Sequence, residues 1–241
     1  MKHVFSSLVP PLLTTLARRF RRNILSRGFT GLNGLDRQLL KHLPQRPGFY
    51  VELGANDGVS QSNTYKLQYS FGWHGLLIEP SPIQYAQCVE NRNFGVAPSI
   101  VCAACVPFEY LDEFVPIEYS NLMSIALGLE VPDEQVMAHA ELGASFLPSK
   151  HHRHRFGAQA RTLTAILAEV NAPSIIDLIS LDVEGNELAV LRGLDFQRYS
   201  PRAILVEVRS RPIADYLNER GYSSHTILSD NGSYKDILFR L

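Results

Sequence analysis

Apolar and polar positions along residues 49–209 follow the pattern of strands joined by helices. Continuous apolar runs, which are typical of strands buried on both faces, occupy residues 49–55, 75–80, 99–106, 175–183 and 202–208. Segments with the apolar spacing of helices lie between them, at about residues 63–69, 82–91 and 186–192. Strands and helices in this order predict a parallel sheet that is covered on both faces.

The C-terminal residues follow a different pattern. Residues 213–221 have the spacing of a helix that ends at Gly221, and two strand-forming runs follow, at 223–229 and 234–241. Between these runs lies S-D-N-G-S, whose Asn-Gly pair is a strong signal for the turn of a β-hairpin. The parallel sheet is therefore predicted to end in an antiparallel hairpin, whereas a typical dehydrogenase continues with parallel units.

Two segments outside this pattern define the expected domain organisation. Residues 1–47 form an N-terminal extension, predicted to be helical around 34–43, ahead of one domain at 48–241. Within that domain, residues 107–160 show no strand–helix–strand order apart from a short helix predicted after Pro132. We interpret them as an insertion over the strand ends, where inserted loops commonly shape a substrate site.

Charge narrows the choice of partners. The 241 residues carry a net charge of −1, so the chain as a whole attracts neither nucleic acid nor an acidic membrane. Residues 1–30 differ, because they hold six basic residues and no acidic one. They could form an amphipathic helix on a membrane surface or partner, or a helix packed beside the domain with a solvated arginine face. Their apolar stretch is too short to span a bilayer and lacks the order of a signal peptide.

The number and placement of the cysteines indicate the redox state of the compartment. Cys102 and Cys105 lie in the apolar run 99–106, where buried structural thiols are expected, since a metal or redox site would need a second such pair. Three cysteines, an odd number, suit a reducing environment. A cytoplasmic location is therefore expected, with peripheral membrane contact through residues 1–30 as an addition to it.

The turn after the first predicted strand is typical of a nucleotide site. In V-E-L-G-A-N-D-G, Gly54 and Gly58 permit a tight turn and the close approach of a ligand. A dinucleotide loop requires glycine where Asn56 stands, and Glu52 and Asp57 would repel a diphosphate. The same carboxylates suit the ammonium and sulfonium groups of S-adenosylmethionine, so the loop favours this methyl donor over NAD. The alternative is a turn with solvated acids.

Acidic residues also end the second and fourth predicted strands. Glu79 follows the glycine loop by about 20 residues, where an acid accepts hydrogen bonds from both hydroxyls of a ribose. D-V-E-G-N-E ends the fourth strand and places Asp182 and Glu184 on the same side. These two carboxylates could take a proton from an acceptor, and together with Glu187 they could hold a divalent cation such as Mg²⁺. Glu187 suits the first turn of the helix that follows.

Four of these segments together resemble the FkbM family of methyltransferases. They are V-E-L-G-A-N-D-G-V-S-Q-S-N-T, G-W-H-G-L-L-I-E-P-S-P, I-D-L-I-S-L-D-V-E-G-N-E-L-A-V-L-R-G and I-L-V-E-V. The resemblance implies a Rossmann-like class I methyltransferase fold of the α/β class, with a mostly parallel seven-stranded sheet ending in an antiparallel hairpin. It implies S-adenosylmethionine as the cofactor, held by residues Glu52, Gly54, Asn56 and Glu79 and flanked at its adenine by Ala103 and Ala104.

The resemblance also implies methyl transfer to a hydroxyl of a sugar, glycan or natural product, with Asp182 or Glu184 as base or metal ligand. Many relatives carry lysine where this chain has Ser180, which affects the expected acceptor. Two rivals remain. An NAD-dependent sugar-modifying oxidoreductase is disfavoured by Asn56 in the glycine position, and a non-catalytic methyltransferase-like binding domain by the retained acids.

Two further groups carry charge near the expected site. The cluster H-H-R-H-R at 151–155 could hold a metal, grip a phosphate or carboxylate of the acceptor, or form a solvated patch. Glu207 and Arg209 end the fifth predicted strand and are expected to face the crevice.

Overall fold

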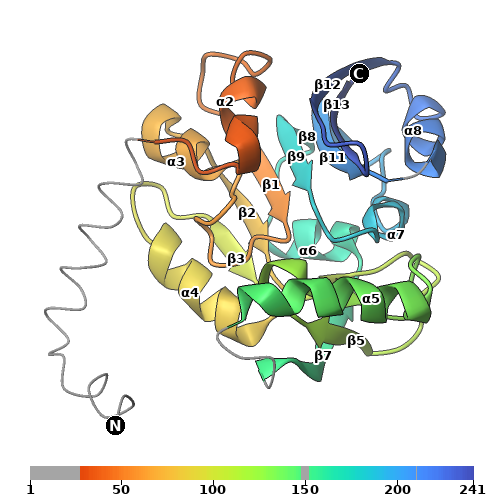
Figure 1. Cartoon of the computed structure of the whole chain (residues 1–241). Helices are drawn as coiled ribbons and strands as arrows, with labels where there is room; N and C mark the ends of the chain where they lie inside the picture. Colours follow the sequence, from red (N-terminus) through yellow and green to blue (C-terminus); the bar gives the residue numbers. More distant parts are fainter. Residues whose placement is uncertain (1–27, 148–151, 210) are drawn as a thin grey trace, which may run out of the picture.

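A seven-stranded sheet forms the centre of the computed structural model, which describes residues 28–147, 152–209 and 211–241 (Figure 1). Its strand order is β12-β13-β11-β9-β1-β2-β3. The strands are β1 (Phe49–Leu53), β2 (His74–Ile78), β3 (Ser99–Val101), β9 (Leu178–Leu181), β11 (Ala203–Val208), β12 (Ser224–Asp230) and β13 (Lys235–Arg240). The five strands β11, β9, β1, β2 and β3 run parallel to one another, whereas β13 pairs antiparallel with β11 and β12. The predicted fold class is confirmed.

Helices cover the sheet on both faces. One face packs against α2 (Leu35–Leu39), α3 (Tyr65–Phe71) and α4 (Pro82–Arg92), and the other against α6 (Leu163–Glu169), α7 (Glu187–Arg192) and α8 (Arg211–Asn218). Side chains alternate between the faces, so that Val51 lies in one apolar cluster and Tyr50 in the other. Because both faces are buried, the strands have the continuous apolar runs seen in the sequence.

Two of the predicted strands are wrong in length, because each divides into two shorter strands. The run 99–106 divides into β3 and the short β4 (Ala104–Cys105), which belongs to another sheet and pairs with β7. The run 175–183 divides into β8 (Ile175–Ile176), which pairs with β10 (Ser200–Pro201), and β9. At this second break, the buried Asp177 accepts a hydrogen bond from Phe49 N and pairs with Arg46. Apolar content alone does not reveal such changes of direction.

The predicted insertion folds into a small sheet with a helix. It contains β5 (Phe114–Tyr119), η3 (Asn121–Met123), β6 (Ile125–Ala126), α5 (Asp133–Gly143), η4 (Ala144–Phe146) and β7 (His154–Arg161). Its strands join β4 in the order β4-β7-β5-β6. The helix predicted after Pro132 is confirmed, and it crosses the region where the strands of the main sheet end (Figure 1).

The described part of the N-terminal extension packs on the domain. After η2 (Leu32–Gly34) and α2, the side chains of Leu35, Leu39 and Leu43 are buried in the apolar cluster on one face of the sheet. The helix is shorter than the predicted one at 34–43, since α2 ends at Leu39. The predicted basic amphipathic segment falls on residues 1–27, which lie outside the described residues. No helix in the described ranges has the length and apolar character needed to cross a membrane.

Candidate active site

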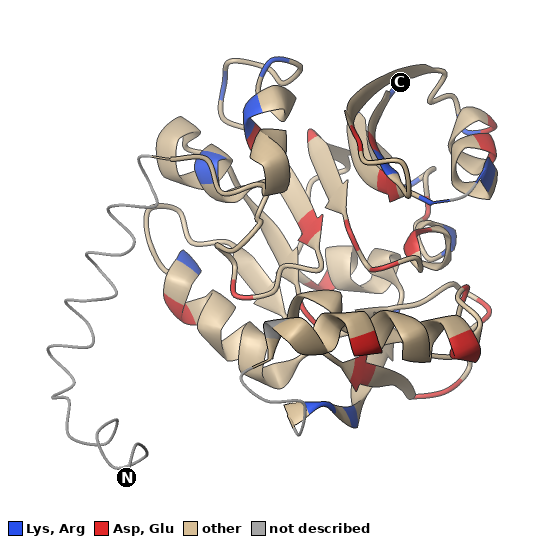
Figure 2. Ribbon diagram, in the orientation of Figure 1, with Lys and Arg blue, Asp and Glu red and all other residues tan. Residues whose placement is uncertain are grey.

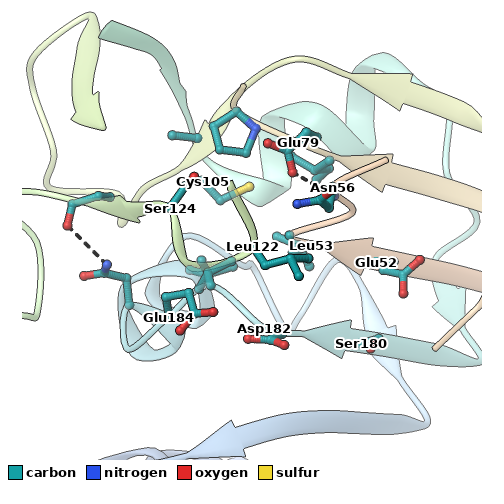
Figure 3. A pocket seen from close by; sticks show the side chains of 18 of the residues that line it. Glu52, Leu53, Asn56, Glu79, Cys105, Leu122, Ser124, Ser180, Asp182 and Glu184 are labelled. Atoms are coloured by element: carbon teal, nitrogen blue, oxygen red, sulfur yellow. Dashed lines mark hydrogen bonds between the residues drawn. The ribbon is translucent and has the colours of Figure 1, made fainter. Parts of the chain in front are cut away.

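A cavity lies at the carboxyl ends of β1, β2 and β9, beneath the insertion (Figure 3). Eight of the ten sequence-predicted site residues line it: Glu52, Gly54, Asn56, Glu79, Ala103, Ala104, Asp182 and Glu184. The insertion completes the wall, in part through Leu122 and Ser124 of the segment around η3. Asp57 and Gly58 do not line this cavity, so their contact with a cofactor remains a prediction.

Gly54 is fixed by its contact with the end of β9. Its φ of +76° is a conformation that favours glycine, and an added Cβ would lie 2.0 Å from the carbonyl oxygen of Asp182. The backbone N–H groups of Gly54 and Ala55 both donate to Ile78 O, each at 3.1 Å. Three strand ends are therefore held together at this glycine, which itself presents only backbone to the cavity.

Glu79 is a buried carboxylate that faces the same turn. Its Oε2 accepts a hydrogen bond from Asn56 N and its Oε1 one from Ser81 N, both at 2.8 Å. The side chain is 5% exposed, and this burial raises the pKa of Glu79 to about 7, although the two N–H groups act in the opposite direction. Each carboxylate oxygen keeps lone pairs for further donors.

Glu52 has a structural task that the sequence did not reveal. Its Oε2 accepts hydrogen bonds from Arg92 at 3.0 Å and from Thr64 Oγ1 at 2.6 Å, and its Oε1 accepts one from Asn63 N. Arg92, on α4, is fully buried. The expectation that the charge of Glu52 attracts a cationic cofactor needs correction, because Arg92 already balances that charge.

Asp57 and Gly58 shape the loop from behind. Asp57 Oδ1 accepts hydrogen bonds from Val59 N and Ser60 N, which closes the turn after β1. Gly58 has a φ of +78°, and an added Cβ would meet Cys88 Sγ at 2.8 Å. Both residues therefore support the turn from outside the cavity.

Three carboxylates meet at the other end of the cavity. Each of Asp182, Glu184 and Glu207 has one carboxylate oxygen in this group, and the three oxygens lie within 4.8 Å of one another. Arg209 Nη2 lies 3.0 Å from Glu184 Oε2 and 2.6 Å from Glu207 Oε1. We call the three carboxylates the acid cluster. Glu207 and Arg209 were expected to face the crevice, but neither lines the cavity, and they meet it only through Glu184 and Asp182.

Lost solvation and mutual repulsion raise the pKa values of two members of the acid cluster, Asp182 and Glu207. Asp182 is exposed, but the surrounding protein removes much of the solvation of its carboxylate, and this together with the charges of Glu184 and Glu207 raises the pKa of Asp182 well above its ordinary value. Burial raises the pKa of Glu207 to about 8, against the opposing charge of Arg209. Repulsion from neighbouring carboxylates adds to that rise.

The D-V-E-G-N-E segment forms a strained turn held by Glu187. Glu184 and Gly185 have φ values of +60° and +99°, and Glu187 Oε1 accepts hydrogen bonds from the N–H groups of Val183 and Gly185 at 3.0 Å. Glu187 begins α7, as expected of a helix-start acid, and is fully buried. It therefore supports the turn that presents Asp182 and Glu184.

The insertion grips this turn through residues that sequence analysis missed. His139 Nε2, on α5, lies 3.0 Å from Glu184 Oε2. Asn186 Oδ1 accepts a hydrogen bond from Glu130 N at 3.0 Å, and an added Cβ on Gly185 would meet Val131 at 2.8 Å. A single histidine on an otherwise ordinary helix carries no motif, so only the structure could identify it.

The basic cluster at 151–155 does not act as one patch in its described part, residues 152–155. Glu118 on β5 binds both arginines, with Arg153 Nε at 3.2 Å from its Oε1 and Arg155 Nε at 2.6 Å from its Oε2. His154 lines a second cavity instead. Figure 2 shows the basic residues where β7 begins. Arg153 also pairs with Glu141, so two carboxylates of the insertion balance the two arginine charges.

Comparisons with known proteins identify the family of this chain. The sequence profile of the Methyltransferase FkbM domain matches residues 52–224. No curated protein matches the chain. Similar solved structures include Methyltransferase FkbM from Methylobacillus flagellatus KT, with 15% identity, a TM-score of 0.48, and coverage of 81% of this chain and 44% of that chain. A human methyltransferase 10 domain containing protein shows 13% identity, a TM-score of 0.44, and coverage of 80% and 71%.

The N-terminal domain of human METTL16 in complex with SAH is similar at 12% identity, with a TM-score of 0.41 and coverage of 85% of this chain and 65% of that chain. The chain thus spans less than half the length of the FkbM structure from Methylobacillus flagellatus KT and just under two thirds of this METTL16 domain.

Proposed function

Because the chain belongs to the FkbM methyltransferase family, a family of S-adenosylmethionine-dependent enzymes, we propose that it methylates a hydroxyl of a sugar, glycan or natural product. The observation that carries this proposal is one cavity with two chemically different ends. Glu79, a buried carboxylate that accepts hydrogen bonds, lies at one end, and Asp182 with the acid cluster lies at the other (Figure 3).

The residues of the first end fit S-adenosylmethionine. Gly54 leaves bare backbone where a side chain would fill the turn, and Glu79 offers carboxylate oxygens to a pair of hydroxyl donors such as those of a ribose. Pro80, Ala103 and Ala104 form a small-residue wall suited to a flat base. When bound, S-adenosylmethionine supplies an electrophilic methyl group on a positively charged sulfur.

The second end fits proton removal. A sugar hydroxyl is a poor nucleophile near neutral pH, so its proton must leave as the oxygen attacks. Asp182 is the cavity-lining member of the acid cluster that forms no ion pair with Arg209 among the described contacts. Its raised pKa makes its carboxylate a stronger base, and the proton passes from the hydroxyl oxygen to Asp182. Glu184 lies beside it and is held by Arg209 and His139.

A metal-assisted version of this step is the second arrangement. Asp182, Glu184 and Glu207 offer the oxygen ligands that Mg²⁺ prefers. Arg209 already contacts two of these three carboxylates, so a cation would share or displace its contacts. Direct proton removal by Asp182 therefore ranks first, and sensitivity to chelators separates the two arrangements.

Titration calorimetry tests the donor. The purified chain is expected to bind S-adenosylmethionine and its demethylated product, and to give no heat with NAD. Comparable heat with NAD would favour the rival oxidoreductase. Mass spectrometry of the small molecules that co-purify then supplies candidate acceptors, and transfer of a labelled methyl group to one of them tests catalysis. A chain that binds the donor but methylates none of its co-purified ligands would be a binding domain.

The cellular setting is part of the proposal. Cys88, Cys102 and Cys105 are all free thiols, which supports a reducing compartment such as the cytoplasm. The basic residues within 1–30 support peripheral contact with a membrane, where an acceptor could reside. Measuring the binding of the full chain to anionic vesicles, with a chain that lacks residues 1–27 as comparison, tests this contact.

A further inference from the structure

A second cavity, of about 530 Å³, adjoins the first and has no part in the mechanism above. It lies among the turn after β1, helix α4 and two parts of the insertion. Asn56, Ser60, Asn121 and Leu122 line both cavities, so the two spaces share a wall. The described lining includes no lysine or arginine. It therefore lacks the cations that commonly bind phosphate or carboxylate groups.

Gln84 leaves a buried acceptor in this wall. It lies on α4, is 5% exposed, and donates from Nε2 to Asn121 Oδ1 at 2.7 Å. Its Oε1 is buried and has no hydrogen-bond partner among the described residues. Buried polar atoms in proteins are nearly always paired, so an orphaned oxygen in a cavity wall indicates a missing donor.

His154 adds a second acceptor. Its Nδ1 lies 2.8 Å from the backbone oxygen of His152. Because a carbonyl oxygen only accepts, Nδ1 carries the hydrogen, and in that tautomer Nε2 is an acceptor. The ring lies 4.8 Å from that of Tyr119, which also lines the cavity. The neighbouring Arg153 and Arg155 pair with Glu118 and Glu141 and do not line this cavity.

We propose that the second cavity binds a neutral, hydroxyl-rich group of the acceptor, such as a sugar ring next to the one that is methylated. Acceptor atoms on Gln84 and His154 match hydroxyl donors, and the ring of Tyr119 offers an apolar surface to the C–H groups of a sugar. The shared wall at Asn121 and Leu122 joins this subsite to the methyl-donor cavity. The inference rests on the proposed function, since it assigns the second cavity to the same acceptor.

Saturation-transfer NMR on the full chain tests this subsite with defined probes. The probes are the methyl glycosides of glucose, galactose, mannose, rhamnose and N-acetylglucosamine, each added to protein saturated with S-adenosylhomocysteine. We expect transfer to the ring protons of at least one glycoside. Gln84→Leu and His154→Phe should each weaken its binding by about five- to tenfold, the effect of one lost hydrogen bond. Gln197→Leu and His225→Phe, at exposed positions outside both cavities, are the matched controls.

The outcomes separate this inference from the proposed function. Failure of the wild-type chain to bind S-adenosylhomocysteine would overturn the proposed function. Normal binding of S-adenosylhomocysteine without transfer to any glycoside would overturn the subsite alone. So would a glycoside that shows transfer only when S-adenosylhomocysteine is left out, or one that both variants bind as the wild type does. Affinity for S-adenosylhomocysteine also shows that each variant is folded, and Gln84→Met replaces Gln84→Leu if the branched side chain disturbs α4.

Discussion

His139 Nε2 and Glu184 Oε2 lie 3.0 Å apart, although one belongs to the insertion and the other to the turn after β9. The direction of the contact departs from hydrogen-bond geometry, so it is a close polar contact rather than a hydrogen bond. Glu184 Oε2 also contacts Arg209, which is held by Glu207. The insertion, which covers the cavity, is therefore linked to the acid cluster through the carboxylate of Glu184.

We expect His139→Leu to loosen the insertion. Without the contact to Glu184, the segment before helix α5 keeps its hydrogen bond to Asn186, but the helix loses its contact with the acid cluster. Hydrogen exchange of the amides at 133–143 should become faster than in the wild type. Gln135→Leu, on an exposed position of the same helix, is the control and should leave the rates unchanged. Equal rates in both variants would show that His139 does not anchor α5.

The same measurement on the free wild-type chain tests the insertion as a cover. Residues 107–160 are expected to exchange faster than the strands at 49–55 and 175–183, because loops over a binding site are drawn from the less stable parts of a fold. Protection equal to that of the strands would make the insertion a permanent part of the core.

Gly54→Ala should be strongly destabilising. The added methyl group would lie 2.0 Å from Asp182 O, and the φ of +76° is itself unfavourable for alanine. Gly232→Ala is the matched control, because its φ is +87° and nothing lies within 4 Å of the added atom. The control should cost about 1 kcal/mol, the penalty of backbone conformation alone, and Gly54→Ala several times more. Similar unfolding free energies for the two variants would contradict the close approach of β1 and β9.

Glu79→Gln should weaken the binding of S-adenosylhomocysteine and stabilise the fold at high pH. The pKa of Glu79 rises on folding from 4.5 to about 7, so its contribution to stability is present below pH 4.5 and is lost as the pH rises through 7. At pH 8 the variant should therefore be more stable than the wild type by roughly 1–3 kcal/mol, and this gain should vanish near pH 4.5. Its affinity for S-adenosylhomocysteine at pH 8 should fall by about 1–3 kcal/mol. Urea unfolding and calorimetry at the two pH values provide the check, and a pH-independent difference would contradict the burial of a charge at Glu79.

Arg92→Met should destabilise the fold through Glu52. Removing the arginine leaves Glu52 buried without its cation, which typically costs about 3–5 kcal/mol. In the double variant with Glu52→Gln, much of that loss should be recovered, because no unpaired charge remains. Chemical unfolding of the two single variants and the double variant measures this coupling. Additive losses would mean that the two side chains act independently.

The sequence predicted what depends on local pattern. Continuous apolar runs located the strands of the main sheet, and the Asn231-Gly232 turn located the hairpin. The break at Cys102–Ala103 escaped prediction, since both halves of the run are apolar while belonging to different sheets. Helix α6 was not predicted either.

The site was predictable where it consists of strand ends. Glu79, Asp182 and Glu184 follow predicted strands directly, and parallel strands bring their carboxyl ends to one edge. Arg92 and His139 could not be found in this way. Each comes from a helix distant in sequence, and only the packing of that helix brings its charge to Glu52 or Glu184.

The acid cluster leads to the last prediction, which concerns Asp182. Asp182→Asn keeps the size of the side chain and removes its ability to accept a proton, whereas alanine would also leave a hole. We expect affinity for S-adenosylhomocysteine to stay near the wild-type value and the rate of methyl transfer to fall by about 10²-fold or more, the usual effect of losing a general base. Glu184→Gln should have a smaller effect on the rate if Glu184 only supports the cluster.

Chelation then decides how the carboxylates act. Activity lost on treatment with EDTA and restored by Mg²⁺ would mean that Asp182, Glu184 and Glu207 hold a cation that polarises the hydroxyl. Activity indifferent to EDTA would support direct proton removal by Asp182, with Arg209 balancing the remaining carboxylates. Full turnover in both Asp182→Asn and Glu184→Gln would exclude these two side chains from the chemistry. Glu207, whose pKa is raised to about 8, would then be the next candidate for the base.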